Sequence, residues 1–113
     1  MHYMTITWDD FEKIDIRAGT ILEVTDFPKA KKPSYKIKID FGLLGIKMSS
    51  AQITKFYARE DLLNKQVIAV VNFPVKQIAD YCSECLILGI YTNEKDVVLL
   101  QPERKVENGW KIG

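Results

Sequence analysis

Apolar and polar positions alternate with a period of two along much of the chain, which is the pattern of half-buried β-strands. The cleanest example is YKIKIDF at 35–41, where the odd positions are apolar while Lys36, Lys38 and Asp40 face the other way. Further short strands are predicted, with polar turns between them, at 46–50, 66–74, 84–91 and 96–102. The pattern therefore predicts an all-β protein.

The first strand is predicted to begin at Ile14, and its alternation resumes with a shifted phase after Gly19. A glycine at a phase shift predicts a bulge or sharp bend in a long, curved strand. Helical turns are predicted at 7–14, with Thr7 as N-cap, and at 58–63. Many short strands and little helix indicate an antiparallel barrel, because closure removes the exposed edges. Patterning alone leaves the OB-fold and other small barrels open.

Length and composition indicate the number of domains and the cellular compartment, but they add nothing to the predicted fold. We expect residues 1–113 to form one domain, since no linker, repeat or low-complexity segment interrupts them. The chain start lacks the features of a secretory leader, and the longest apolar run, 67–71, is too short to cross a bilayer. With only two cysteines, these features predict a cytoplasmic protein with free thiols and no membrane insertion.

Groups that could perform catalysis are scarce. The single histidine, His2, lies in a terminus expected to be frayed, and no glycine-rich phosphate loop occurs. Cys82 and Cys85 form a C-x-x-C ahead of a predicted strand, whereas a structural zinc needs four ligands and a thioredoxin-like site needs a helix. We therefore expect no enzyme, no cofactor and no metal. A zinc site shared between two copies of the chain is the alternative.

Positive charge concentrates in one part of the predicted barrel, although the net charge is only +1. Six lysines lie in the loop 27–34 and on the two strands after it: Lys29, Lys31, Lys32, Lys36, Lys38 and Lys47. On one side of a barrel they would follow a phosphate backbone, and the alternative is a solvated strand face beside a flexible basic loop.

Short polar side chains near the predicted strand ends are further candidates for contacts with RNA phosphates, 2′-hydroxyls or base edges. These candidates are Ser49, Ser50, Gln52, Asn72 and Ser83. Turn-capping is the alternative role for each of them. Apart from Tyr35 this region is poor in aromatic residues. Recognition of a folded RNA by shape and backbone is therefore favoured over stacking on single-stranded bases.

Five segments spread over nearly the whole chain carry motifs in a defined order. They are DFEKIDIRAGTI (10–21), KMSSAQIT (47–54), VVNFPVKQI (70–78), SECLIL (83–88) and VVLLQPERKVENGWKI (97–112). Together they resemble the tRNA-binding domain family, the OB-fold module of EMAP-type cytokine precursors and methionyl-tRNA synthetase tails. The sequence departs from that pattern at Cys85, where the family commonly has a small or apolar residue, and at Leu86, where synthetase-type members carry methionine.

The resemblance implies a homodimeric five-stranded Greek-key OB-fold with extensions at both ends, which binds tRNA or another structured RNA without catalysis. It is strongest to small bacterial members described as export-related chaperones, so unfolded preproteins are possible partners. The second hypothesis is a chaperone that holds such clients in apolar grooves near the dimer junction. The candidates for dimer or client contact are Trp8, Phe11, Phe73 and Trp110. Packing in the core or in the dimer interface is the alternative to client contact for these aromatic side chains.

Overall fold

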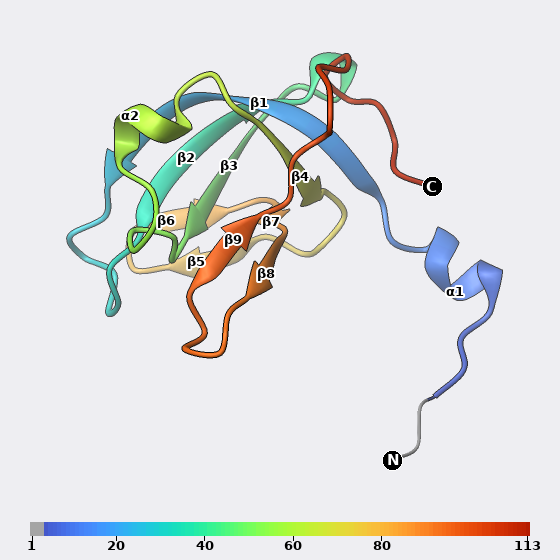
Figure 1. The fold of residues 1–113 in the computed structure, drawn as a ribbon, viewed down its shortest axis with the longest axis horizontal. Helices are drawn as coiled ribbons and strands as arrows, with labels where there is room; N and C mark the ends of the chain where they lie inside the picture. Colours follow the sequence, from blue (N-terminus) through green and yellow to red (C-terminus); the bar gives the residue numbers. More distant parts are fainter. Residues whose placement is uncertain (1–3) are drawn as a thin grey trace.

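The protein, described here over residues 4–113 by a computed structural model, is built around a strongly curved antiparallel sheet (Figure 1). The strands of this sheet are β1 (Ile16–Asp26), β2 (Tyr35–Asp40), β3 (Ile46–Ala51), β4 (Gln66–Val70) and β7 (Leu86–Ile87). They are hydrogen-bonded in the order β3-β2-β1-β4-β7. Contacts between the outer strands β3 and β7 nearly close the barrel, so the predicted OB-fold is confirmed.

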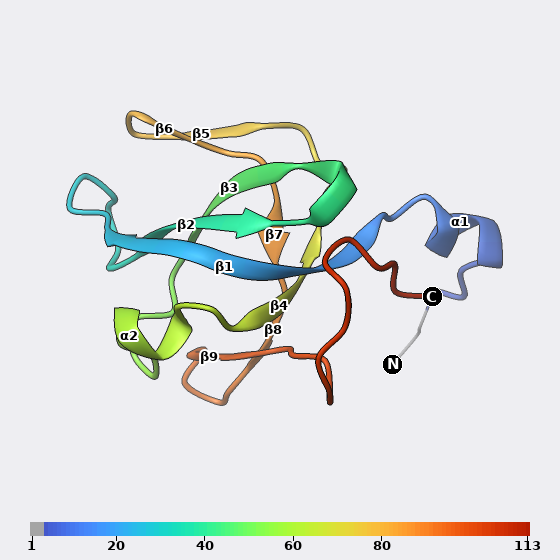
Figure 2. The ribbon, with the colours of Figure 1, turned by 90° about the horizontal axis from the view of Figure 1, so that it is seen from above.

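Short elements decorate this barrel. The additional strands form two hairpins, β5 (Lys76–Ile78) with β6 (Tyr81–Ser83) and β8 (Gly89–Tyr91) with β9 (Val97–Leu99). The two hairpins lie on opposite sides of the barrel (Figure 2). The helical elements are α1 (Trp8–Glu12), the 3₁₀ turn η1 (Gly42–Leu44) and α2 (Arg59–Leu62). In the described part of the chain, no helix is long and apolar enough to cross a membrane.

The structure corrects two predictions about the strands. The predicted strand 84–91 is divided into β7 and β8 at Leu88, whose N–H donates to the carbonyl of Ile68 while its own carbonyl accepts from Leu100. The hairpin β5–β6 was not predicted, because its sequence KQIADYCS is short and shows no sustained alternation. Both errors concern strands of three residues or fewer, where the periodic signal is weak.

Strand β1 holds the barrel together because it pairs with different partners along its two halves. Residues 16–20 pair with β4, and residues 20–26 pair with β2. The predicted bulge at Gly19 is wrong in position, because the register shift falls between Ile21 and Glu23. Gly19 itself pairs regularly with Val67. The shift lets one continuous strand turn from one side of the barrel to the other.

Gly19 is needed for close packing. A Cβ at this position would lie 2.6 Å from Ile39 Cγ2 and 2.8 Å from two carbons of the Phe41 ring. Ile39 and Phe41 are fully buried and belong to the core, together with Ile21, Ile37, Leu62 and Val67. The absent side chain on β1 therefore makes room for the largest side chain at the centre of the barrel.

The C-terminal segment covers the part of β1 that β2 leaves unpaired. The N–H of Ala18 donates to the carbonyl of Trp110, and the N–H of Ile112 donates to the carbonyl of Ile16. Gly109 adopts a φ of +91° and donates its N–H to the carbonyl of Ala18. This segment acts as an additional edge strand, which satisfies backbone groups that the barrel alone would leave exposed.

The predicted helix at the N-terminal end is confirmed as α1, with Thr7 as its N-cap. The Thr7 hydroxyl accepts from the N–H of Asp10, and the Asp10 carboxylate accepts from the N–H of Thr7, both at 3.1 Å. These two hydrogen bonds lower the pKa of Asp10 from its usual value. The capping box thus fixes a helix that projects from the barrel (Figure 1).

Replacing Gly19 by alanine is expected to lower the free energy of unfolding by about 1–3 kcal/mol, because the new methyl group overpacks the core against Ile39 and Phe41. Urea denaturation of the two proteins measures this difference. Gly113→Ala is the matched control, since a Cβ there meets nothing within 4 Å. Equal stability of Gly19→Ala and the wild-type protein would contradict this account of the barrel.

Candidate nucleic-acid interface

The outer face of β2 presents the lysines that the alternating pattern predicted. Tyr35, Ile37 and Ile39 are buried, whereas Lys36 and Lys38 lie on the outer face. In the register with β3, Lys36 lies opposite Ser50 and Lys38 opposite Met48. A polar surface therefore extends across β2 and β3, which is the face that OB-folds commonly use for oligonucleotides.

Two loops flank this surface at one end of the barrel (Figures 1 and 2). The first is the β1–β2 loop 27–34, which carries Lys29, Lys31 and Lys32, and the second is the hairpin β5–β6. Lys29 Nζ lies 2.9 Å from Asp80 Oδ2, so an ion pair joins the loop to the hairpin. The pairing raises the pKa of Lys29 and lowers the pKa of Asp80.

Lys36 lies between the same two loops and contacts an aromatic side chain from each. Its Nζ is 5.0 Å from the ring centroid of Phe27 and 5.2 Å from that of Tyr81. The two rings meet edge to face with centroids 5.5 Å apart. Cation–π attraction therefore holds the Lys36 ammonium in place without neutralising it. Burial raises the pKa of Tyr81 to about 12.

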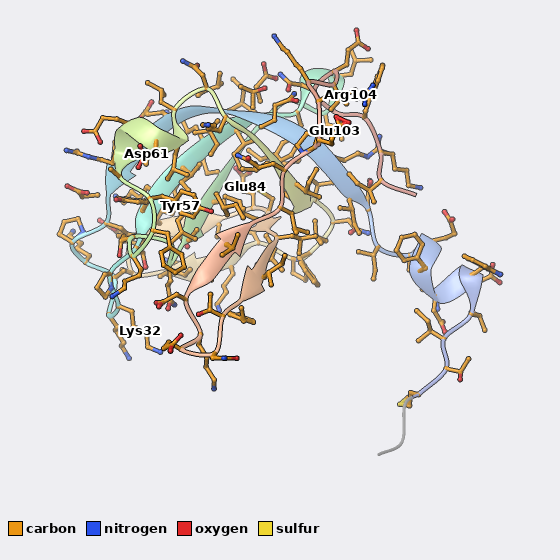
Figure 3. The ribbon with its side chains drawn as sticks, viewed as in Figure 1. Lys32, Tyr57, Asp61, Glu84, Glu103 and Arg104 are labelled. Atoms are coloured by element: carbon orange, nitrogen blue, oxygen red, sulfur yellow. The ribbon has the colours of Figure 1, made fainter. Side chains whose placement is uncertain are left out.

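The remaining lysines of this region differ in whether a carboxylate neutralises them. Lys38 is 3.6 Å from Glu23, across the β1–β2 pair. Lys31 and Lys32 are exposed and have no carboxylate within 4 Å among residues 4–113. Figure 3 shows Lys32 on the β1–β2 loop, pointing away from the barrel. We define the lysine surface as Lys29, Lys31, Lys32, Lys36 and Lys38 together with Ser50.

Two of the residues predicted on β3, Lys47 and Ser49, do not lie on this surface. Lys47 is opposite buried Ile39 in the β2–β3 register, so it leaves the sheet on the other face from Lys36 and Lys38. Ser49 is 0% exposed, and its hydroxyl donates to the carbonyl of Cys85 at 2.8 Å. The expected row of lysines is therefore divided between two faces. The alternation of β3 contains this information, but the short pattern IKMSS does not show which face is buried.

The motif Ser83-Glu84-Cys85 joins β3 to the strand region that completes the barrel. The Glu84 carboxylate accepts from the N–H of Met48 at 2.9 Å, and the N–H of Glu84 donates to the carbonyl of Met48 at 2.7 Å. The Ser83 hydroxyl donates to the carbonyl of Cys85 at 3.3 Å. These side chains form hydrogen bonds inside the protein, and Figure 3 shows Glu84 over the interior of the ribbon. Sequence reasoning missed Glu84, which was visible only as part of the motif.

The last two predicted polar residues occupy different positions. Gln52 is exposed just after β3 ends. Asn72 uses both ends of its amide, accepting from the N–H of Asp15 at 2.9 Å and donating to the carbonyl of Lys13 at 2.7 Å. Asn72 therefore fixes the connection between α1 and β1 against the loop after β4. Neither residue touches the lysine surface through a hydrogen bond within residues 4–113.

Large apolar side chains are exposed at a second region, around α1 and the C-terminal segment. Trp8 is 85% exposed, Phe73 54% and Trp110 56%, whereas Phe11 is half-buried. Core packing is therefore wrong as an explanation of Trp8, Phe73 and Trp110. The ion pair between Lys111 and Glu12, at 3.5 Å, joins the C-terminal segment to α1. Trp8, Phe11 and Trp110 thus belong to the extensions predicted at the two ends of the chain, whereas Phe73 lies in the loop between β4 and β5.

The two cysteines have different surroundings, and both are free thiols. Cys82 is exposed on β6, whereas Cys85 is buried. The Cys85 thiol donates a weak hydrogen bond to the carbonyl of Met48, with a sulfur-to-oxygen distance of 3.8 Å. Burial raises the pKa of Cys85 to about 11. Within the described residues, no group of three or more His, Cys, Asp or Glu side chains could hold a metal ion, and His2 lies outside those residues.

A thiol reagent such as iodoacetamide is expected to modify Cys82 in the folded protein and Cys85 only after unfolding. With a pKa of about 11, Cys85 is about 1% thiolate even at pH 9, and its burial excludes the reagent. Mass spectrometry after timed labelling at pH 7–9 measures both sites. The control variant Cys82→Ser should show almost no labelling until denaturant is added. Rapid labelling of Cys85 in this folded variant would contradict the packing described here.

Comparison with solved structures places this geometry among known proteins. The chaperone CsaA of Bacillus anthracis strain Ames superposes with a TM-score of 0.93 at 47% identity, covering 97% of this chain and 100% of that one. The CsaA chaperone protein of Picrophilus torridus superposes with a TM-score of 0.90 at 55% identity, covering 96% of this chain and 100% of that one. The chain is thus similar to these two proteins over its whole described fold.

Comparison with curated sequences gives relatives that are much longer. The methionine–tRNA ligase of Pyrococcus abyssi is 37% identical over 109 residues, which cover 96% of this chain and 15% of the enzyme. The chain thus spans only a small part of the length of such relatives. Residues 16–111 match a family described as "Putative tRNA binding domain", a description of binding and not of catalysis. Because this match covers most of the chain, the protein belongs to the tRNA-binding domain family.

Proposed function

We propose that this protein binds tRNA or another structured RNA through the lysine surface, without catalysing a reaction. The observation that carries the proposal is the position of Lys31 and Lys32, which are exposed, free of carboxylate partners within residues 4–113 and next to the β2–β3 face of an OB-fold. The family description and the methionine–tRNA ligase relatives support tRNA as the ligand.

The proposed contacts divide into a fixed part and a mobile part. Lys36 is held between Phe27 and Tyr81, so its ammonium is already placed before RNA arrives. Lys31 and Lys32 have long, solvated side chains that can follow the phosphates of a folded RNA. The ion pair of Lys29 with Asp80 keeps the loop against the hairpin and places one negative charge among the lysines. Shape and backbone, more than base identity, are therefore expected to decide binding.

Reversing two charges tests this proposal directly. The double variant Lys31→Glu with Lys32→Glu is expected to weaken tRNA binding roughly tenfold or more. The slope of log Kd against log salt concentration should also fall by about 0.7–0.9 for each phosphate contact that is lost. Filter binding between low and physiological salt measures both quantities. The control Lys95→Glu changes the net charge as much as one reversal, but it lies in the turn of the hairpin β8–β9. Full binding by the double variant would refute the lysine surface.

We also propose that the chain forms a homodimer through the aromatic region around α1. The exposed Trp8 lies on a helix that projects from the barrel, with exposed Met4, Ile6 and Trp110 also belonging to the two terminal segments. An apolar area at the two ends of a small chain is suited to a second copy of itself, because a two-fold contact buries the same patch on both copies. Apolar burial then stabilises the pair.

Light scattering of the wild-type protein at micromolar concentration is expected to give about twice the chain mass of 13.0 kDa. Trp8→Asp should shift the mass toward that of the monomer, because burying the new carboxylate is unfavourable. Since Trp8 is exposed in the single chain, the Trp8→Asp variant should fold normally and show the same circular dichroism spectrum as the wild type. Trp8→Phe is the control that keeps an apolar ring. A monomeric wild type, or a dimer unaffected by the aspartate, would exclude this interface.

Binding of unfolded polypeptides is a second candidate function, and the same exposed aromatic side chains favour it. Apolar patches on a surface mark sites for other chains, and the two structural neighbours are named as chaperones. Apolar capture is not weakened by salt, whereas phosphate binding is. The variant Lys31→Glu with Lys32→Glu therefore separates the two functions. It should suppress the aggregation of a reduced client protein as well as the wild type does, although its tRNA binding is weakened. We place both in the cytoplasm, where Cys82 and Cys85 would remain free thiols.

A further inference from the structure

A hollow of about 520 Å³ opens beside β1, away from the lysine surface. It lies between Thr20 of β1, the turn that joins α2 to β4, and the segment after β9. Its lining has two lysines, four amide or hydroxyl side chains and no carboxylate, and we call it the amide pocket: Thr20, Asn64, Lys65, Gln66, Gln101 and Lys105.

The wall of the amide pocket is fixed by a network of side-chain hydrogen bonds. The Thr20 hydroxyl donates to Asn108 Oδ1 at 2.6 Å. The Gln66 amide donates to the carbonyl of Val106 at 2.7 Å and accepts from the N–H of Val106 at 3.0 Å. This paired contact holds the segment that carries Lys105 against β1 and β4. The backbone that carries Lys105 is therefore fixed beside Gln66, the residue that follows Lys65.

The charged groups at the amide pocket are positive and unpaired. Neither Lys65 nor Lys105 has a carboxylate within 4 Å in the stretch 4–113. Asp40, which lies opposite Thr20 in the β1–β2 register, accepts from the N–H of Gly42 at 2.8 Å, and Asp61 accepts from the N–H of Ala58 at 2.9 Å. These two carboxylates keep their charge, but neither forms an ion pair with Lys65 or Lys105. Glu103 forms an ion pair with the adjacent Arg104. No negative group of the described chain neutralises the two ammonium groups.

We propose that the amide pocket binds a phosphate-bearing anion. Lys65 and Lys105 both line this hollow, so its charge is positive, which disfavours a cation and attracts an anion. The amides of Asn64 and Gln101 belong to the same lining and can donate to the remaining oxygens. A tetrahedral phosphate, with several oxygens that accept hydrogen bonds from different directions, fits this arrangement of donors better than a planar carboxylate does.

The amide pocket is separate from the lysine surface, so it does not rest on the function proposed above. Figure 2 shows the segment after β9 and the hairpin β5–β6 on opposite sides of the barrel. Figure 3 shows Arg104, next to Lys105 in sequence, far from Lys32. The phosphate has two possible sources, a free small molecule or the backbone of a bound RNA that reaches around the barrel. The experiment below distinguishes them.

Pyrophosphate is the probe, titrated into ¹⁵N-labelled protein at constant ionic strength while amide shifts are followed. Saturable shifts are expected at residues 64–66, at residue 101 and at residues 103–106, because Pro102 has no amide N–H. The variant Lys65→Gln with Lys105→Gln should bind pyrophosphate at least about tenfold more weakly, since it lacks both charge-assisted hydrogen bonds. Lys55→Gln with Lys95→Gln is the matched control, because it removes two exposed lysines outside the lining and should leave the affinity unchanged.

Repeating the titration with saturating tRNA assigns the source. If tRNA removes the pyrophosphate shifts at 64–66 and the double variant also weakens tRNA binding, the pocket holds an RNA phosphate. If the shifts persist beside bound tRNA, the ligand is a free phosphate compound. The proposal is overturned if wild-type protein shows no saturable shifts at these residues, or if Lys65→Gln with Lys105→Gln binds pyrophosphate as tightly as the control. The amide shifts of the wild-type protein alone test the proposal, even if the double variant fails to fold.

Discussion

The contact between the bare backbone of Gly19 and the side chains of Ile39 and Phe41 is the constraint on which the barrel depends. Because Gly19 lies where β1 passes from its β4 partner to its β2 partner, close approach there lets one strand serve both sides of the sheet. Phe41 also marks the end of β2, and its carbonyl lies against Gly109 of the C-terminal segment. One contact thereby links the centre of the core to the segment that covers the unpaired edge of β1.

The features that the sequence predicted are those with a strong local signal. YKIKIDF alternates over seven residues, so β2 and the outward direction of Lys36 and Lys38 followed from the pattern. The side chain of Asn72 and the pairing of Gln66 with Val106 could not be predicted, since both join residues about 40 or more positions apart. Lys47 was placed on the wrong face for a related reason. Its strand is short, and only the register with β2 fixes which side is buried.

The family motif at 83–85 contributes more to closing the barrel than to forming a binding surface. Glu84 exchanges two hydrogen bonds with the backbone of Met48, and Ser49 and Ser83 both donate to the carbonyl of Cys85. In a sheet whose last strand, β7, has only two residues, these side chains replace missing ladder hydrogen bonds between β3 and the chain after β6. A polar motif can therefore identify a binding-domain family while its polar atoms are occupied within the fold.

Net charge is a poor guide to this protein because its lysines and carboxylates are unevenly distributed over the surface. The carboxylates of the first helix, Asp9 and Asp10, lie on α1, at the opposite end of the molecule from the β1–β2 loop with Lys31 and Lys32 (Figure 1). The molecule measures 40 × 38 × 28 Å, whereas charges in physiological salt are screened beyond about 8 Å. A polyanion near the loop therefore experiences the local lysines, two of which are paired with Asp80 and Glu23, and almost none of the distant acidic residues. With a total of +1, the chain can carry positively charged surfaces on opposite sides of its barrel and still avoid a large overall repulsion between copies.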